Sequence, residues 1–167
     1  MAKIFLTLLL ALVGGCPIGS AAQHEGSIVT GRDLSQFPGL RKAIEQYYVA
    51  EKNRNWRVAY DYRPVVFQRT VPFNVYQREM EKGSSGWSLI RVKILDSKRT
   101  ESDEVQVMLK FYESFDAATA QSYFEGRVPS GINSRVEETI WKWSANSWLS
   151  VQPGQRGRFP LNDRLVY

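Results

Sequence analysis

Side chains that could carry acid–base or metal chemistry are few in this chain. Its only histidine is His24 and its only cysteine is Cys16, both near the N-terminus. One residue of each kind cannot supply the ligands of a zinc site, and no phosphate-binding glycine loop is present. We therefore expect no metal and no cofactor. Without a histidine in the body of the chain, the candidates for general acid–base work are carboxylates, of which Glu138 and Asp61 lie in patterned segments.

These two carboxylates have an ordinary interpretation as well as a catalytic one. Glu138 alternates with Val136 and Ile140, and burial on that strand face would raise its pKa into the range of a general acid or base. Glu138 also shares the face with Lys142, and a charge pair within a sheet explains such spacing more simply. The sequence thus favours a non-enzymatic protein. The alternative is a periplasmic enzyme that uses Glu138 or Asp61 as its acid–base group.

The N-terminus has the layout of an export signal. Lys3 supplies a positive charge, and Ile4–Val13 is a nearly unbroken apolar run of ten residues, whereas a membrane-spanning helix needs about 20. The following stretch, Leu12–Cys16, resembles the lipobox of bacterial lipoproteins, which implies that Cys16 is lipidated, carries palmitate and begins the mature chain. A cut after Ala22 resembles an ordinary signal-peptidase site. We expect a periplasm-facing lipid anchor in the cell envelope; a soluble periplasmic or secreted protein is the alternative.

The net charge of the chain indicates which kinds of partner are favoured. The chain has 22 basic and 17 acidic residues, a net charge of +5, which favours anionic neighbours such as lipid head groups. It has no basic run and no nucleic-acid-binding motif, so nucleic acid is not expected as a partner. Because Cys16 has no second cysteine to pair with, no disulfide helps to hold the exported domain together.

The first half of the predicted domain is helical. Apolar residues recur at three- and four-residue spacing, and Asn55 and Asn74 can each cap a helix by accepting a backbone N–H. Pro64 ends the second helix and Gly83 ends the third. The predicted helices are 38–52, 55–63 and 74–83.

The second half alternates with a period of two, which is typical of half-buried strands. The predicted strands are 87–96, 104–113, 135–144 and 148–152, with a polar hairpin turn at 98–103. Residues 116–134 are expected to be a flexible connection with one helical turn near 117–123. The fold class is therefore α+β, with N-terminal helices packed on a curved antiparallel sheet of about four strands. The predicted divisions are a signal peptide (1–15), a tether (16–33), the α+β domain (34–154) and a C-terminal tail (155–167).

Residues 34–153 resemble the nuclear-transport-factor-2-like superfamily, whose overall shape is also called cystatin-like. The resemblance lies in the long first helix, the Asn55-Trp56 start of the second helix, and late strands that carry tryptophans. It implies a cone with a pocket between helices and sheet. Members of this family include enzymes, ligand binders and structural modules, and they often pair through their sheets.

Aromatic residues form the predicted binding surface. Trp141 and Trp143 share one strand face, and Trp148 follows after the turn. If they face outward, they form a platform for a protein partner, in a homodimer or an envelope complex. If they face inward, they line a pocket for a small apolar ligand together with Trp56 and Tyr60. Alternation alone permits both orientations.

Overall fold

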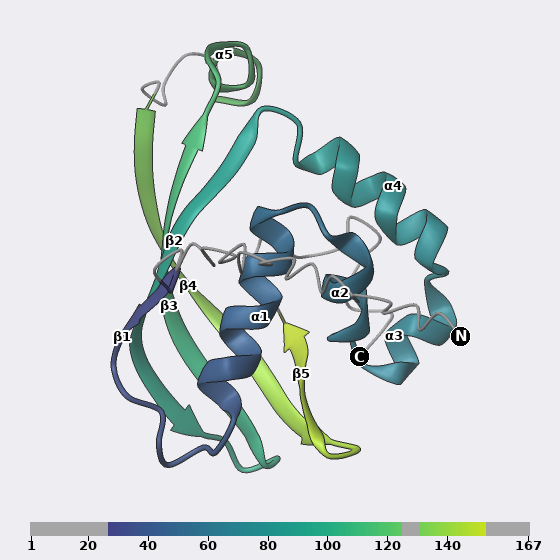
Figure 1. Ribbon diagram of the computed structural model, residues 1–167, viewed down its shortest axis with the longest axis vertical. Helices are drawn as coiled ribbons and strands as arrows, with labels where there is room; N and C mark the ends of the chain where they lie inside the picture. The colour runs from purple at the N-terminus through teal and green to yellow at the C-terminus, as the bar shows by residue number, and fades with distance from the viewer. Residues whose placement is uncertain (1–26, 125–130, 153–167) are drawn as a thin grey trace, which may run out of the picture.

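The computed structural model describes residues 27–124 and 131–152, which form one sheet and five helices (Figure 1). The predicted signal peptide (1–15), most of the predicted tether and the predicted C-terminal tail lie outside the described residues. The elements are, in chain order, β1 (Val29–Gly31), α1 (Leu40–Lys52), α2 (Trp56–Asp61), α3 (Val65–Thr70), α4 (Phe73–Gly83), β2 (Trp87–Arg99), β3 (Glu104–Phe115), α5 (Ala117–Phe124), β4 (Gly131–Ser144) and β5 (Ser147–Gln152).

The sheet has the strand order β1-β2-β3-β4-β5, and the last four strands are antiparallel neighbours joined in sequence. The strands β2 to β5 confirm the four predicted strands and the hairpin between the first two. Helices α1 to α4 lie on one side of the sheet, and α5 lies at one end of it (Figure 1). The mixed α+β class is therefore confirmed.

A fifth strand comes from the segment predicted to be tether. Strand β1 pairs in parallel with β2, with Val29 opposite Val92, and Val29 is buried. Gly31 ends β1 at φ +96°, where a Cβ atom would collide with the carbonyl oxygen of Ile94. Only glycine allows this close approach at low cost. The packed domain therefore includes Ile28 and begins before the predicted boundary at Leu34.

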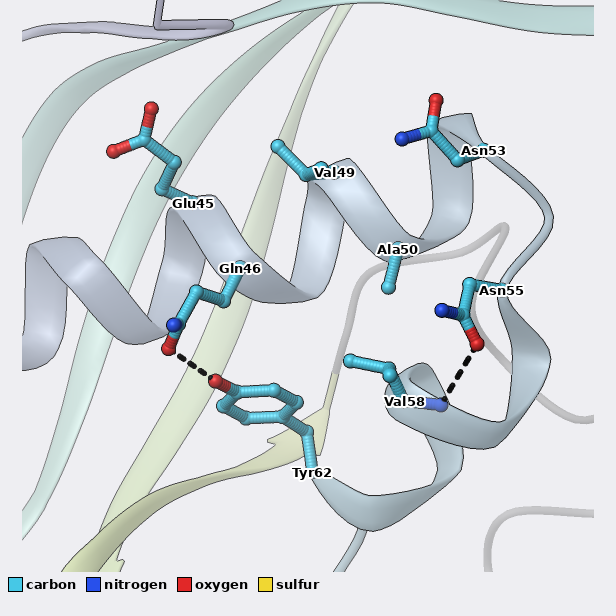
Figure 2. Close-up of a pocket in the computed structure, with 8 residues that line it drawn as sticks. All are labelled: Glu45, Gln46, Val49, Ala50, Asn53, Asn55, Val58 and Tyr62. Atoms are coloured by element: carbon cyan, nitrogen blue, oxygen red, sulfur yellow. Dashed lines mark hydrogen bonds between the residues drawn. The ribbon is translucent and has the colours of Figure 1, made fainter. Parts of the chain in front are cut away.

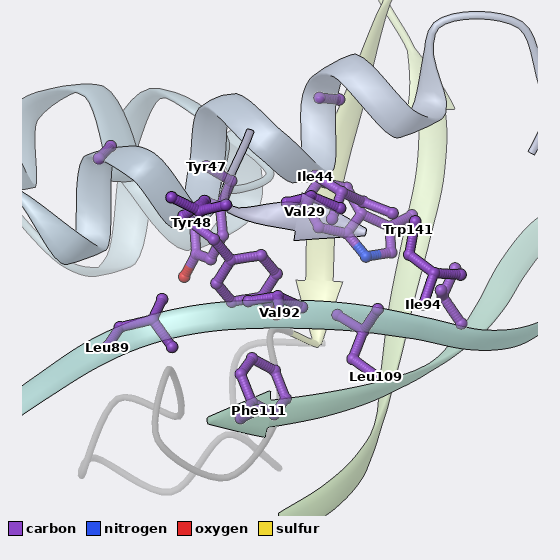
Figure 3. Packing of buried hydrophobic residues seen from close by; sticks show 14 of the residues in the cluster. Val29, Ile44, Tyr47, Tyr48, Leu89, Val92, Ile94, Leu109, Phe111 and Trp141 are labelled. Carbon is purple, nitrogen blue, oxygen red and sulfur yellow. The ribbon is translucent and has the colours of Figure 1, made fainter. Parts of the chain in front are cut away.

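Helix α1 occupies the concave face of the sheet and provides one side of the core (Figure 3). Leu40, Ile44, Tyr47 and Tyr48 recur at helical spacing, and each is buried against the strands. Full burial of one such side chain stabilises a fold by about 1.5–3 kcal/mol. The amphipathic pattern predicted for this segment is confirmed in full.

The remaining helices differ in part from their prediction. Asn55 caps α2 as expected, since its side-chain oxygen accepts from the backbone N–H of Val58 at 3.3 Å. Helix α4 begins at Phe73 after Pro72, so Asn74 is not the cap. Helix α3 was not predicted, because it has only six residues and depends on the tertiary burial of Phe67. Between β3 and β4, α5 confirms the helical turn predicted near residues 117–123, and β4 begins at Gly131, earlier than predicted.

Candidate functional site

Trp141, one of the predicted surface residues, is a core residue. Its side chain is fully buried and lies edge-on to Tyr47, with ring centroids 5.8 Å apart (Figure 3). Its indole nitrogen donates to the hydroxyl oxygen of Thr139 at 3.1 Å, and that hydroxyl donates to the carbonyl of Val107. The space between α1 and β4 is thus occupied by the indole itself and by the ring of Tyr47.

Trp56 and Tyr60 belong to a different cluster, built by α2, α3 and α4. The hydroxyl of Tyr60 donates to the carbonyl of Val71 at 2.6 Å, and its ring centroid lies 5.2 Å from that of Tyr76. The cluster contains Trp56, Tyr60, Phe67, Val71, Tyr76 and Met80. The structure therefore does not bring the five predicted aromatic residues together: Trp141 and Trp148 belong to the core between α1 and the sheet, Trp56 and Tyr60 to this second cluster, and Trp143 is exposed.

Both candidate catalytic carboxylates are exposed. Asp61 is the last residue of α2, and Glu138 lies on the outer sheet face opposite Met108. Lys142, the expected partner of Glu138, instead pairs with Glu104 at 3.6 Å. The predicted burial of Glu138 was wrong because Trp141 and Thr139 set the phase of β4, and Glu138 has the opposite phase. Both carboxylates are therefore open to solvent.

A buried carboxylate that we did not single out from the sequence lies on the inner sheet face. Glu113 is 2% exposed, accepts from the indole nitrogen of Trp87 at 2.9 Å and from Nε of Arg135 at 3.1 Å. Arg135 also pairs with Glu137. The signal was present in the sequence, because Glu113 is in phase with the buried apolar residues of β3. Its two oxygens are engaged, so this carboxylate holds Arg135 in place.

A second buried polar contact joins two residues of α1. The hydroxyl of Tyr47 donates to a carboxylate oxygen of Glu51 at 2.6 Å, and Glu51 is 5% exposed. Burial raises the pKa of Tyr47 and of Tyr48 well above the usual value near 10, and the negative charge of Glu51 adds to both shifts. Both tyrosines therefore remain neutral hydrogen-bonding groups over the physiological range.

An exposed tryptophan lies at the β4–β5 hairpin, packed on buried Trp148, which in turn contacts buried Phe37. Trp143 is 52% exposed and is directly opposite Trp148, with ring centroids 5.5 Å apart. The indole nitrogen of Trp148 donates to the carbonyl of Pro38 at 2.9 Å, and its ring meets Phe37 edge-on at 6.5 Å. We call the residues Phe37, Trp143 and Trp148 the aromatic end. Because Trp148 is held from two sides, it presents Trp143 on a rigid base.

Local backbone geometry positions this aromatic end. Ala145 and Asn146 both have positive φ, which gives the two-residue turn whose twist matches antiparallel strands. That turn places Trp143 and Trp148 opposite each other. Gly39, at φ +79°, begins α1 beside the indole of Trp148. The pairing of the two tryptophans thus depends on the hairpin, and the orientation of Trp148 depends on the loop before α1.

Hollows on the described surface include the following pair. One, of about 320 Å³, adjoins the aromatic end and is lined by residues 33–35, 37–39, 41, 42 and 45. The other, of about 290 Å³, lies between α1 and α2 (Figure 2). In the second hollow, Tyr62 donates to the side-chain oxygen of Gln46 at 2.7 Å, and Asn55 caps α2. These two contacts are made within the fold, whereas the first hollow includes Phe37 of the aromatic end.

The described residues contain no group of histidine, cysteine and carboxylate side chains that could hold a metal ion. In the same part of the chain, none of the helices has the length and apolarity to cross a bilayer. Cys16 and His24 lie outside the described residues.

Comparison with known proteins gives a distant fold neighbour. No family model and no curated protein matches the chain. Among solved structures, the chain is similar to a SEC-C motif-containing protein from Rhodopseudomonas palustris, with 12% identity and a TM-score of 0.43. The match covers 62% of this chain and 67% of that one. A likeness of this size carries no argument, so function rests on the side chains described above.

Proposed function

We propose that the protein is a non-enzymatic, exported envelope protein, anchored by lipid at Cys16, that works by binding another protein. The export signal and the lipobox-like Leu12–Cys16 stretch support the anchor. The exposure of Asp61 and Glu138 argues against the enzymatic alternative. A soluble periplasmic or secreted form, cut after Ala22, is the alternative location.

The half-exposed indole of Trp143, seated on Trp148, is the observation that carries the binding proposal. Moving a large aromatic side chain out of water is favourable, and this one loses little conformational entropy on binding because its base is already fixed. Tryptophan is also over-represented among the residues that dominate protein–protein affinity. Protein binding at the aromatic end accounts for this exposure better than a small apolar ligand inside the fold, where Trp141 and Tyr47 already pack.

The partner in this proposal is an envelope protein, and a second copy of this chain is the first to test. We also propose that the fold is a variant of the nuclear-transport-factor-2-like cone. The position of α1 in the concave face of an antiparallel sheet supports that assignment. In this variant the part of the cone under α1 is filled by Trp141.

The anchor is tested by labelling cells with palmitate. Wild-type protein expressed in a bacterium with a lipoprotein pathway should take up label, and Cys16→Ala should take up none. Equal incorporation into both would remove the anchor from the proposal. Uptake into neither, with a mature N-terminus at Gln23, would establish the soluble alternative.

Binding at the aromatic end is tested by placing a photo-crosslinking amino acid at position 143. Position 66 on α3 is a matched control, since Val66 is 60% exposed and apolar but does not belong to the aromatic end. A discrete product from position 143 alone, identified by mass as a homodimer or a defined complex, would support the proposal. Identical products from the two positions, or none from position 143, would contradict it.

A further inference from the structure

The outer face of the sheet, on the side away from α1 to α4, carries a group of cations. Arg91, Lys93, Lys98 and Lys110 alternate with the buried residues of β2 and β3 and therefore project from the opposite face. We call these four residues the basic patch. Three of them are exposed and Lys110 is half-buried.

The register brings like charges together in this patch. Lys93 lies directly opposite Lys110 on the neighbouring strand, and Arg91 lies opposite Tyr112. The guanidinium of Arg91 lies 4.0 Å from the centroid of the Tyr112 ring, and the Lys110 ammonium lies 5.3 Å from it. Directly opposed like charges destabilise a sheet pair. An anion bound over these side chains would relieve that repulsion.

Carboxylates on the same face are engaged elsewhere or stand apart. Asp96 pairs with Arg32, and Glu104 pairs with Lys142. Glu138 is exposed on β4, opposite Met108. Within residues 27–124 and 131–152, no carboxylate lies within ion-pair distance of the basic patch. The positive charge of the patch is therefore directed at the solvent.

Apolar side chains adjoin the basic patch on the same face. Val136 on β4 lies opposite Lys110 and is 49% exposed, and Ile132 on the same strand is 72% exposed. Met108 of β3 is half-buried beside them. The face thus combines cations with exposed aliphatic groups, which is the composition that suits the boundary between lipid head groups and acyl chains.

We propose that this outer sheet face rests on an anionic lipid surface. The four cations contact the phosphate groups, and Ile132 and Val136 enter the interface beside them. A lipid surface fits better than a structured anionic protein because the charges spread along a continuous sheet face with exposed aliphatic groups beside them. This inference goes beyond the protein contact at Trp143, and it does not depend on the anchor at Cys16.

The test uses the mature chain without its lipidated cysteine, beginning at Pro17, and vesicles that lack or contain phosphatidylglycerol. Lys93→Gln/Lys110→Gln removes two charges from the patch. Lys52→Gln/Lys82→Gln is the matched control, because both lysines are exposed in the last turns of α1 and α4. Each basic residue near an anionic surface contributes enough that losing two should weaken partitioning by about 30-fold at low salt. The control pair should weaken it by less than about twofold.

Wild-type binding to anionic vesicles alone, with the large loss confined to the patch variant, would establish the proposal. Equal losses in the two double variants would show that only net charge matters and would overturn the proposal. Equal binding of the wild-type chain to neutral and anionic vesicles, or no binding to either, would also overturn it. Val136→Asn should also weaken binding several-fold, and unchanged binding would overturn the interfacial part. Single Lys93→Gln and Lys110→Gln variants give the same test if the double variant does not fold. None of these outcomes affects palmitate labelling or crosslinking from position 143.

Discussion

The indole of Trp141 meets the ring of Tyr47 edge-on, at 86° and with centroids 5.8 Å apart. This contact joins the last long strand to the first helix. Edge-to-face geometry is the favoured arrangement of aromatic pairs and adds about 0.5–1.5 kcal/mol to the gain from burial. The pair therefore fills the space between helix and sheet in which one of the two predictions placed a ligand pocket.

Replacing Trp141 should therefore be costly. Trp141→Ala removes a fully buried indole and should lower the free energy of unfolding by about 3–5 kcal/mol. Trp143→Ala, on the same strand, should cost much less because that ring is half exposed. Denaturant unfolding of both variants measures the difference. Similar losses would mean that Trp143 is as important to the core as Trp141.

The buried carboxylate of Glu113 should matter to stability, whereas Glu138 should not. Glu113→Gln removes the negative charge beside Arg135 and weakens the contact with Trp87, so a loss of about 1–3 kcal/mol is expected. Glu138→Gln should stay within about 0.5 kcal/mol of wild type. Chemical denaturation of both variants at neutral pH measures the two losses in the free energy of unfolding. A larger effect at Glu138 than at Glu113 would contradict the positions of the two carboxylates.

Stability should decline in alkaline solution because the pKa values of Tyr47 and Tyr48 are raised in the folded state. Their contribution is fully present below pH about 10, where folded and unfolded chains both hold the protons. Above that pH the unfolded chain releases them first, so stability falls by about 1.4 kcal/mol per pH unit for each tyrosine until the folded pKa is reached. Unfolding experiments from pH 8 upward, at intervals of about one unit, measure this slope.

Tyr47→Phe separates the contribution of one tyrosine to that slope. The variant should lose about 1–3 kcal/mol at neutral pH, because the bond to Glu51 is missing. It should also show a shallower decline above pH about 10 than wild type, since one titrating group is gone. An unchanged slope would show that Tyr47 is not the source of the alkaline loss.

Alanine substitution at two glycines should change the stability of the fold in opposite directions. Gly31→Ala places a Cβ atom against the backbone of Ile94 at positive φ and should cost at least about 2 kcal/mol. Gly83 ends α4, and a Cβ atom there would meet only open space, so Gly83→Ala should raise stability by about 0.4–1 kcal/mol. Thermal unfolding checks both. A neutral Gly31→Ala would argue against the pairing of β1 with β2.

Much of the fold was predictable from local patterns. Helix α1 and strands β2 and β3 have long periodic stretches, and periodicity reports which side of an element is buried. The elements that were not predicted, β1 and α3, have three and six residues. Such short segments show little period of their own, and these two depend on single contacts such as the burial of Val29 or Phe67. Helix α2 and strand β5 also have six residues, but the Asn55 cap and the turn before Trp148 mark where they begin.

The candidate site was less predictable than the fold. The sequence singled out the tryptophans by residue type, but it could not divide Trp141 from Trp143 although they share a strand face. That division depends on how far α1 and the loop before it cover the sheet. The burial of Glu113 was visible in the sequence, because this residue alternates in phase with the buried residues of β3. Its partner was not visible, because Arg135 lies on another strand.

By itself, the sequence determined the α+β class and the order and approximate limits of the long elements, while the export-type N-terminus stays a prediction. Those properties follow from composition and from spacing along the chain, which act locally. Only the tertiary structure decided which tryptophan is core, which carboxylate is buried, and that Lys93 and Lys110 lie face to face. These facts depend on sheet register and on helix placement, since both bring together residues that have no local relationship in the sequence.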